Sequence, residues 1–454
     1  MRRREDAMHV YHADLASQAV PRYTSYPTAA AFDDRVGVLA QAEALAAIPR
    51  DMPVSLYIHI PYCHEICWYC GCNTGAVGKP ERLQQYLAAL RAEIDTVAQR
   101  MRGKVVALHF GGGSPNALSP DDFVALVADL RSAFAIDDDA ECAVELDPRH
   151  LDAAYAAALA RAGVTRASLG VQTLALPVQA AIGRIQPRRM IATAFAALRD
   201  AGIERVNADL MYGLPGQTLD DIAATIATIT PLHPDRIAMF GYAHAPRMFP
   251  RQRRIADDDL PDAEARFWQS ALAYDLLCEA GYTAIGFDHF AMPDDSLAIA
   301  AAEGRLRRNF QGFTDEPATA IIGLGASAIS QFDGLLVQNE KHVGSWRLRV
   351  SNGLLAGSRG VVRSLDDRLR GEIIERLLCD GRVDVAEIAA RHGLGTALLG
   401  EARPALLALA NRGLVDLHDW TVRILPEGRP YARLAAAAFD TRRVNAMGQF
   451  SRAV

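Results

Sequence analysis

The sequence predicts an α/β fold in which parallel strands alternate with helices and form an open (β/α) barrel. Three observations lead to this prediction. Short runs of β-branched and other apolar residues alternate with longer stretches, rich in alanine and leucine, that have the helical period. About six such units follow one another, which is typical of a partial or complete barrel. The chain has 454 residues, half of them hydrophobic, which is enough for one large domain with smaller additions.

The elements can be predicted in order along the chain. Helices are expected between the strands, most clearly at 81–100 and after Ser119, which suits an N-cap followed by Pro120. In (β/α) barrels the chemistry takes place at the C-terminal ends of the strands, so the residues that follow each strand are the site candidates. The expected strands, the last of which is either a barrel strand or an accessory one, are 54–60, 105–110, 142–146, 166–171, 205–211, 236–242 and 282–287.

The flanking regions differ from the barrel. Pro21 and Pro27 lie among hydroxyl and aromatic residues, which favours an extended arm, followed by a helix at about 38–47. Near the other end, two short helices (384–393 and 406–413), a hairpin (414–425) and a further helix (426–439) follow in the order of a winged helix. That segment has no basic recognition helix, so we prefer a packing module or lid to DNA binding. The expected regions are an arm (1–50), a barrel (51–300), a substrate-side extension (301–364) and a mostly helical, winged-helix-like domain (365–454).

Charge and hydropathy narrow the functional class. The net charge of −6 gives no general attraction to nucleic acid or anionic membranes. No apolar run reaches transmembrane length, and the basic start lacks the apolar segment of a secretory signal. We therefore expect a cytoplasmic monomer that has neither nucleic acid nor a membrane as its partner.

Four of the seven cysteines form a C-x3-C-x2-C-x-C motif: Cys63, Cys67, Cys70 and Cys72. Clustered cysteines in a reducing compartment usually bind metal, and thiolates select zinc, copper(I) or iron–sulfur clusters. We interpret the first three as ligands of a [4Fe–4S] cluster whose fourth iron stays open. A zinc knuckle and a four-cysteine electron-transfer cluster are the alternatives. The remaining cysteines are expected to be core residues: Cys142, Cys278 and Cys379.

Further candidates follow the strands. The glycines at 111–113 lack the lysine of a P-loop and the spacing of a dinucleotide motif, so they indicate close approach of backbone to a ligand. Glu145 inside a barrel needs a partner, which is either a buried salt bridge or a ligand hydroxyl. Asp209 and Arg184 have the same ambiguity, and Tyr57 alone would be read as a core aromatic.

The cysteine motif, with Tyr69 before its third cysteine, resembles the signature of the radical S-adenosylmethionine (SAM) superfamily. There the open iron chelates SAM, which is cleaved to a 5′-deoxyadenosyl radical. The whole set of motifs resembles the bacterial oxygen-independent coproporphyrinogen III oxidase (coproporphyrinogen dehydrogenase) family, from about residue 20 onward. Shorter haem-chaperone relatives lack the arm and Cys72. The matching segments are 21–28, 59–72, 168–172, 184–187, 209–218, 242–244, 286–291, 308–312 and 325–330.

The resemblance implies roles by matching position. Cys63, Cys67 and Cys70 would bind the cluster, and Tyr69 adjoins it. Residues around the SAM on the open iron would be Tyr57, Gly112, Glu145 and Ile329. Residues around a second SAM, with Cys72 nearby, would be Gly113, Ser114, Gln172, Arg184, Asp209 and Ala243. Residues expected to take part in the reaction itself are Cys72, Tyr57 and Arg22 of the arm.

The implied reaction converts two propionates of coproporphyrinogen III to vinyls, giving protoporphyrinogen IX for haem synthesis. A radical cofactor performs the difficult C–H step, while the protein binds, orients and excludes water. Electrons would come from a flavodoxin- or ferredoxin-like donor and leave to an unidentified acceptor. Candidate cations for the propionates are Arg22, Arg307 and Arg308.

Three alternatives remain open. One is a haem-binding, chaperone-like paralogue on the same barrel. Another is a radical SAM methyltransferase or cyclopropanase, which also uses two SAM molecules. The third, from a different class, is an electron-transfer or DNA-binding regulator that carries a cluster but does not cleave SAM.

Overall fold

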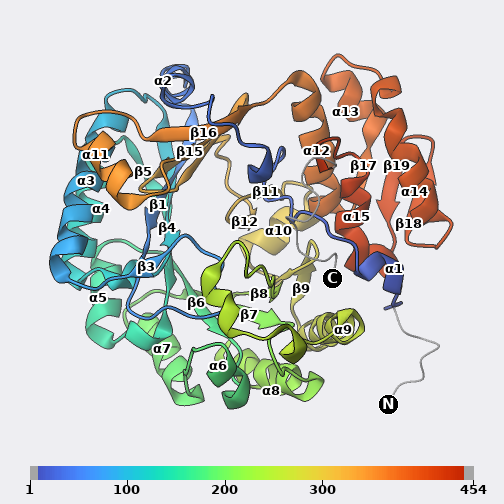
Figure 1. Ribbon diagram of the computed structural model, residues 1–454, viewed down its shortest axis with the longest axis horizontal. Helices are drawn as coiled ribbons and strands as arrows, with labels where there is room; N and C mark the ends of the chain where they lie inside the picture. Colours follow the sequence, from blue (N-terminus) through green and yellow to red (C-terminus); the bar gives the residue numbers. More distant parts are fainter. Residues whose placement is uncertain (1–8, 444–454) are drawn as a thin grey trace.

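The computed structural model describes residues 9–443, and one twelve-stranded sheet organises them (Figure 1). Its order is β16-β15-β14-β13-β1-β4-β5-β6-β7-β8-β10-β9. The strands from β13 to β8 pair in parallel, and the strands outside them pair antiparallel. The parallel strands are β1 Pro53–Ile60, β4 Lys104–Gly112, β5 Ile136–Leu146, β6 Arg166–Gln172, β7 Arg205–Tyr212, β8 Arg236–Gly241 and β13 Ala320–Leu324. The six strands predicted for the barrel are all present.

The two ends of the sheet lie outside the parallel barrel strands. The segment 282–287, expected as a barrel strand or an accessory one, forms the accessory one: β9 Thr283–Ile285, an antiparallel edge strand that pairs with β10 His289–Ala291. At the other end, β13 adds a parallel strand beside β1. The chain then turns back through β14 Ile329–Phe332, β15 Leu335–Asn339 and β16 Gly357–Val362. These strands were not predicted, and they extend the barrel wall beyond β1.

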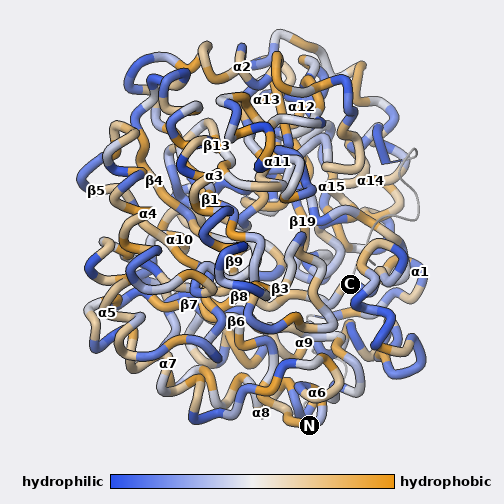
Figure 2. The backbone as a smooth tube through the Cα atoms, turned by 60° about the vertical axis from the view of Figure 1, so that its left-hand side comes forward, coloured by the Kyte–Doolittle hydropathy of each residue, from blue (hydrophilic) through white to orange (hydrophobic). Residues whose placement is uncertain are grey.

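Helices cover the outer face of the parallel strands (Figure 1). They are amphipathic, and Figure 2 shows hydrophilic and hydrophobic residues alternating along them. In α4 Pro120–Ala133, Ser119 caps the first turn by accepting a hydrogen bond from Asp122 N–H, while Phe123 and other apolar residues of the helix are buried. Burial of each such side chain contributes about 1.5–3 kcal/mol. The other covering helices are α3 Pro80–Ala98, α5 Ala153–Arg161, α7 Arg188–Asp200, α8 Leu219–Ile229 and α9 Ala263–Glu279.

The last part of the chain packs beside the barrel around a second hydrophobic core (Figure 1). Its small sheet has the order β17-β19-β18. The expected helix at 426–439 is instead a 3₁₀ turn, Pro426–Tyr431, followed by α15 Ala432–Ala437, because Pro430 within it cannot donate a helical hydrogen bond. The other elements are α12 Leu365–Asp380, β17 Arg382–Asp384, α13 Val385–Arg391, α14 Arg403–Ala410, β18 Val415–His418 and β19 Thr421–Ile424.

The arm runs between these two parts of the molecule. After the short α1 Ala13–Ala16 it is largely extended up to residue 28, and α2 Val38–Ala46 follows where a helix was predicted. Tyr23 donates a hydrogen bond from its hydroxyl to Asp440 (2.9 Å). Asp33 forms a β-bridge with Gly360 at the far end of the sheet. The arm is therefore attached to the sheet extension and to the last described residues. Among the helices of residues 9–443, none is both long enough and apolar enough to cross a membrane.

Candidate active site

The loops that leave the C-terminal ends of β1, β4, β5, β6 and β7 enclose a cavity of about 240 Å³. Most of the predicted site residues meet there, although they come from five separate strand ends. Those that line the cavity are Cys63, Cys67, Tyr69, Cys70, Cys72, Gly112, Gly113, Ser114, Glu145, Gln172, Arg184 and Asp209. The position of this cavity agrees with the rule that barrel enzymes react at the C-terminal ends of their strands.

The cysteine loop is held by backbone hydrogen bonds to its neighbours. Trp68 N–H donates to the carbonyl of Ile182 (2.9 Å), and Cys72 N–H donates to Sγ of Cys70 (3.3 Å). Interaction with Cys72 lowers the pKa of Cys70 to about 6. Burial and the neighbouring thiols raise the pKa of Cys63 to about 12. A bound metal centre would favour the thiolate form of both.

The donor set suits a cluster better than a single ion. Within residues 9–443, no three cysteine, histidine or acidic side chains lie close enough together to hold one metal ion. A tetrahedral zinc ion binds its sulfurs at about 2.3 Å and so keeps them within about 4 Å of one another. Cys63, Cys67 and Cys70 come from one loop and face one cavity, and thiolates of this kind hold iron–sulfur clusters.

Two arginines lie beside the buried thiol of Cys67. Arg184 Nη1 is 3.3 Å from its Sγ and Arg149 Nη2 is 3.5 Å from it. Asp147 holds both guanidinium groups, at 3.2 Å from Arg184 Nη1 and 2.7 Å from Arg149 Nη2. Although burial favours the neutral acid, the two arginines lower the pKa of Asp147 to about 2. Cys67 therefore lies in a cationic environment that is fixed by an ionised carboxylate.

The glycine turn after β4 packs tightly against the cysteine loop. Gly113 N–H donates to the carbonyl of Ile60 (2.8 Å), and Ser114 N–H donates to that of Tyr62 (2.8 Å). A Cβ atom at Gly113 would lie 2.5 Å from the Tyr62 carbonyl oxygen. Gly112 has a φ of +107°, which side chains rarely tolerate. Glycine is therefore required here by the close approach of two loops, and the turn offers only backbone to the cavity.

Two carboxyl groups, Glu145 on β5 and Asp209 on β7, differ in protonation. Glu145 accepts hydrogen bonds from His109 Nε2 (3.0 Å) and Gly112 N–H (3.4 Å). These bonds outweigh the effect of burial and lower the pKa of Glu145. Burial, reinforced by the charge on Glu145, raises the pKa of Asp209 to about 7. Glu145 is thus ionised at neutral pH, while the carboxyl group of Asp209 is about half protonated.

Four of the residues predicted to bind SAM or to take part in the reaction itself lie outside the cavity wall. Tyr57 bonds through its hydroxyl to His59 Nδ1 (3.1 Å), and Ile329 packs with Phe32. The Ala243 carbonyl accepts a hydrogen bond from Gln252 (3.2 Å), whose same amide nitrogen also donates to the carbonyl of Tyr69 (2.7 Å).

Arg22 is the fourth of these residues. Its guanidinium lies over the ring of Phe240, 5.9 Å from the centroid, and it donates to the carbonyl of Gly241. Because Phe240 lines the cavity, the arm reaches the site through Arg22.

The other two arginines predicted to meet the substrate lie elsewhere. Arg308 is buried and donates to the backbone carbonyls of Tyr23 (3.3 Å) and Arg22 (3.2 Å). Arg307 lies 3.6 Å from Glu375 and lines a different cavity. Neither lines the cysteine cavity, Arg308 holds the arm, and a contact of either arginine with the substrate stays a prediction.

Sequence reasoning missed three residues of the site: His109, Asp147 and Arg149. Asp147 and Arg149 follow the strand that ends with Leu146, so their position after a barrel strand was an available signal. His109 is a polar residue inside an apolar strand, and such a residue needs a partner.

Comparison with known proteins agrees with this geometry. Residues 57–229 match the Radical SAM superfamily. A protein of Bradyrhizobium diazoefficiens named oxygen-independent coproporphyrinogen III oxidase is 43% identical over 434 residues, which cover 94% of this chain and 96% of the relative. The protein of that name from Escherichia coli is 39% identical over 440 residues, 96% of each chain. This chain belongs to the oxygen-independent coproporphyrinogen III oxidase family.

A solved structure supports the assignment to the oxygen-independent coproporphyrinogen III oxidase family. Escherichia coli coproporphyrinogen III oxidase, described as a radical SAM enzyme, matches with a TM-score of 0.88 and 37% identity. The match covers 93% of this chain and 100% of that one. The predicted family and fold class are confirmed, and the chain is a radical SAM oxidoreductase that uses a [4Fe–4S] cluster and SAM.

Proposed function

We propose that this chain oxidatively decarboxylates two propionates of coproporphyrinogen III to vinyl groups, giving protoporphyrinogen IX. The observation that carries the proposal is the cavity in which the three motif cysteines, the glycine turn and the Glu145–Asp209 pair meet. When bound, the cluster and SAM supply a radical able to take hydrogen from an unactivated carbon. The protein's own residues bind and orient the reactants and control the charge around them.

The proposed ligands of the cluster are Cys63, Cys67 and Cys70. Around the SAM on the open iron, ionised Glu145 is suited to accept hydrogen bonds from ribose hydroxyls, and Gly112 presents only backbone. We propose that Tyr57 and Ile329 complete this position, although neither lines the cavity. Tyr69 closes the side of the cavity next to Cys70.

We propose that a second SAM lies on the opposite side of the cavity, next to Cys72. Arg184 offers a guanidinium for its carboxylate, and Asp209, which is half protonated at neutral pH, is suited to pair with its amino group. Gly113, Ser114, Gln172 and Ala243 complete this position.

Arg22 is placed to meet a propionate, because its guanidinium reaches the cavity wall at Phe240 from the arm. The proposal also includes a flavodoxin- or ferredoxin-like electron donor, a separate electron acceptor and a monomeric enzyme. We propose the same regions as the sequence predicts: arm 1–50, barrel 51–300, extension 301–364 and C-terminal domain 365–454.

The test is an anaerobic assay with reconstituted cluster, reductant, SAM and coproporphyrinogen III, followed by oxidation and identification of the porphyrins by fluorescence and mass. Protoporphyrin together with 5′-deoxyadenosine is the expected result. Cys63→Ala should abolish both, whereas Cys278→Ala, which removes a cysteine outside the cavity, should leave both unchanged. Cleaved SAM beside intact coproporphyrin would reject this substrate. No SAM cleavage from an intact cluster would favour a haem-binding or regulatory role.

A further inference from the structure

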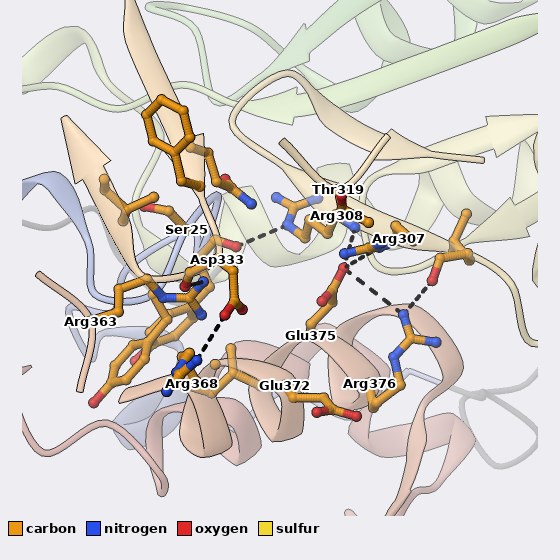
Figure 3. Close-up of a pocket in the computed structure, with 18 of the residues that line it drawn as sticks. Ser25, Arg307, Arg308, Thr319, Asp333, Arg363, Arg368, Glu372, Glu375 and Arg376 are labelled. Carbon is orange, nitrogen blue, oxygen red and sulfur yellow. Dashed lines mark hydrogen bonds and ion pairs between the residues drawn. The ribbon is translucent and has the colours of Figure 1, made fainter. Parts of the chain in front are cut away.

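A second cavity, of about 710 Å³, is lined in part by the arm residues Tyr23, Ser25 and Tyr26 (Figure 3). Thr319, which lines it, precedes β13, whereas the cysteine cavity lies beyond the C-terminal ends of the parallel strands. Its walls come from the arm, the hairpin that contains Arg307, the ends of β14 and β16, and α12. Its volume falls in the range of sites for small molecules.

The lining of this cavity is strongly cationic. Six arginines face three carboxylates, Asp333, Glu372 and Glu375. Figure 3 shows Arg363 and Arg368 beside Asp333, and Arg307 and Arg376 around Glu375. The six arginines are Arg305, Arg307, Arg308, Arg363, Arg368 and Arg376.

The carboxylates pair partly with these arginines and partly with other groups, and Glu375 lies 3.6 Å from Arg307 and 4.0 Å from Arg376. Glu372 accepts hydrogen bonds from His392 Nε2 (2.7 Å) and from Arg391, which is not one of the six arginines of the cavity. Glu375 accepts from the backbone N–H of Arg308 (2.9 Å). Asp333 pairs with Arg368 at 2.8 Å. Arg376 also pairs with Asp380 (2.9 Å) and Arg305 with Glu303, so the excess positive charge of the lining lies on Arg363 and Arg308, which form no ion pair among residues 9–443.

Arg363 is the least compensated of these cations. It donates from Nη1 to the backbone carbonyl of Asp333 (3.1 Å), and among residues 9–443 it forms no ion pair. Its Nε is buried without a hydrogen-bond partner in the described chain, as is Nε of Arg368. Burial lowers the pKa of Arg363, so holding its charge here is costly without an anion. Buried guanidinium donors that lack acceptors indicate a missing acidic ligand.

We propose that this cavity binds a small polyanion, a molecule with two or more phosphate or carboxylate groups, through Arg363, Arg368 and Arg307. The guanidinium fork matches both kinds of group. Two anionic groups are needed because the arginines approach from two walls. Arg363 directly follows β16 and Arg368 lies on α12, whereas Arg307 lies on β11 Arg307–Asn309. This proposal does not depend on the identity of the reaction at the cysteine cavity.

Binding here would also affect the arm. Tyr23, Ser25 and Tyr26 line the cavity, and the residue before them, Arg22, lies against Phe240 of the cysteine cavity. A ligand that contacts Tyr23 and Ser25 therefore stabilises the segment that carries Arg22. The two cavities are linked through a few residues of backbone, so a ligand in one is expected to change the free energy of binding in the other.

The test is isothermal titration of the cluster-loaded full chain at low ionic strength with pyrophosphate, with citrate, and with acetate as the monovalent comparison. We expect saturable binding of one polyanion per chain, weakened by added salt, and no saturation by acetate. Binding of pyrophosphate alone identifies a phosphate ligand, and binding of citrate alone identifies a polycarboxylate. Amide hydrogen exchange at residues 20–28 should slow when the polyanion binds.

Arg363→Gln should weaken that binding about tenfold or more, the effect of losing a charge-assisted contact. Arg161→Gln, which removes the same charge from the exposed end of α5, should bind as the wild type does. Arg368→Gln provides a second variant if Arg363→Gln unfolds, because its side chain is 36% exposed. Absence of saturable binding by both polyanions, or equal affinity in wild type and these variants, would overturn the proposal.

Discussion

Arg149 lies against the sulfur of Cys67, with Nη2 3.5 Å from Sγ, and Asp147 holds it in place. Arg184 approaches the same sulfur at 3.3 Å. Reduction of an iron–sulfur cluster adds a negative charge, which a nearby cation stabilises. The two arginines are therefore expected to raise the reduction potential of a cluster bound through Cys67.

Arg149→Gln should lower that potential by an amount on the order of tens of millivolts, because one of the two cations is lost. Arg149→Lys keeps the charge and should recover part of the change. The measurement is a redox titration followed by electron paramagnetic resonance, with Arg189→Gln on the exposed start of α7 as the control. The same potential in all four proteins would show that Arg149 has only a structural role.

Substitution of Cys72 distinguishes a cluster held by three cysteines of the motif from a cluster held by all four. If Cys63, Cys67 and Cys70 are the ligands, Cys72→Ser should keep the iron and sulfide content of the wild type. SAM cleavage should continue, while formation of protoporphyrinogen should fall by about tenfold or more, as on loss of a group that acts in proton or hydrogen transfer. Iron analysis and product quantification on the same sample test this. Loss of iron from the variant would identify Cys72 as a fourth ligand.

Arg308 is expected to hold the arm rather than the substrate. Arg308→Gln removes the hydrogen bonds to the carbonyls of Arg22 and Tyr23, each worth about 1.5–3 kcal/mol when a charged donor is involved. Amide exchange at residues 20–28 should accelerate about tenfold or more, and the substrate KM should rise while SAM cleavage without substrate stays unchanged. Arg307→Gln, on the same strand but without contact to the arm backbone, is the matched control. Unchanged exchange in Arg308→Gln would contradict this role.

Glu93 makes stability depend on pH. It is buried and accepts hydrogen bonds from Gly325 N–H (2.6 Å) and Asn339 (2.8 Å). Burial raises its pKa to about 7, from 4.5 in the unfolded chain. The folded protein then keeps a proton that the unfolded chain releases, so the stabilisation is complete below pH 4.5 and is lost as pH rises to about 7.

Glu93→Gln cannot titrate and should remove this dependence. Between pH 5 and pH 8 the free energy of unfolding of the wild type should fall relative to the variant by up to about 3 kcal/mol. Urea unfolding of both proteins at the two pH values measures the change. A difference between them that does not vary with pH would mean that Glu93 stays ionised in the folded state.

The barrel strands could be predicted because their signal is local. The segment 54–60 became β1 Pro53–Ile60, and 166–171 became β6 Arg166–Gln172. The extension could not be predicted in the same way. β13 Ala320–Leu324 is only five residues long, and nothing in those five residues identifies β1 as its neighbour. β17, with three residues, is a strand only because β19 pairs with it.

For the site, the sequence predicted which residues meet but not which side chains bind one another. Residues that follow parallel strands must meet at one edge, and so the cysteines, Glu145 and Asp209 do share a cavity. The partner of Glu145 could not be named, because it depends on register. His109 lies opposite Ala143 across the β4–β5 pair, and only that register brings its ring to Glu145. Likewise, nothing in the sequence around Arg308 indicates that its side chain binds the backbone carbonyls of Tyr23 and Arg22.

The pairing of β1 with β13 has a consequence for synthesis of the chain. Val54 leaves the ribosome long before Ala320, its partner in the sheet. At about 5–20 residues per second, one edge of β1 waits roughly 15–50 s for the strand that covers it. During that time its unpaired N–H and carbonyl groups are open to other strands. Nascent chains of this protein are therefore expected to need protection from aggregation until the extension has emerged.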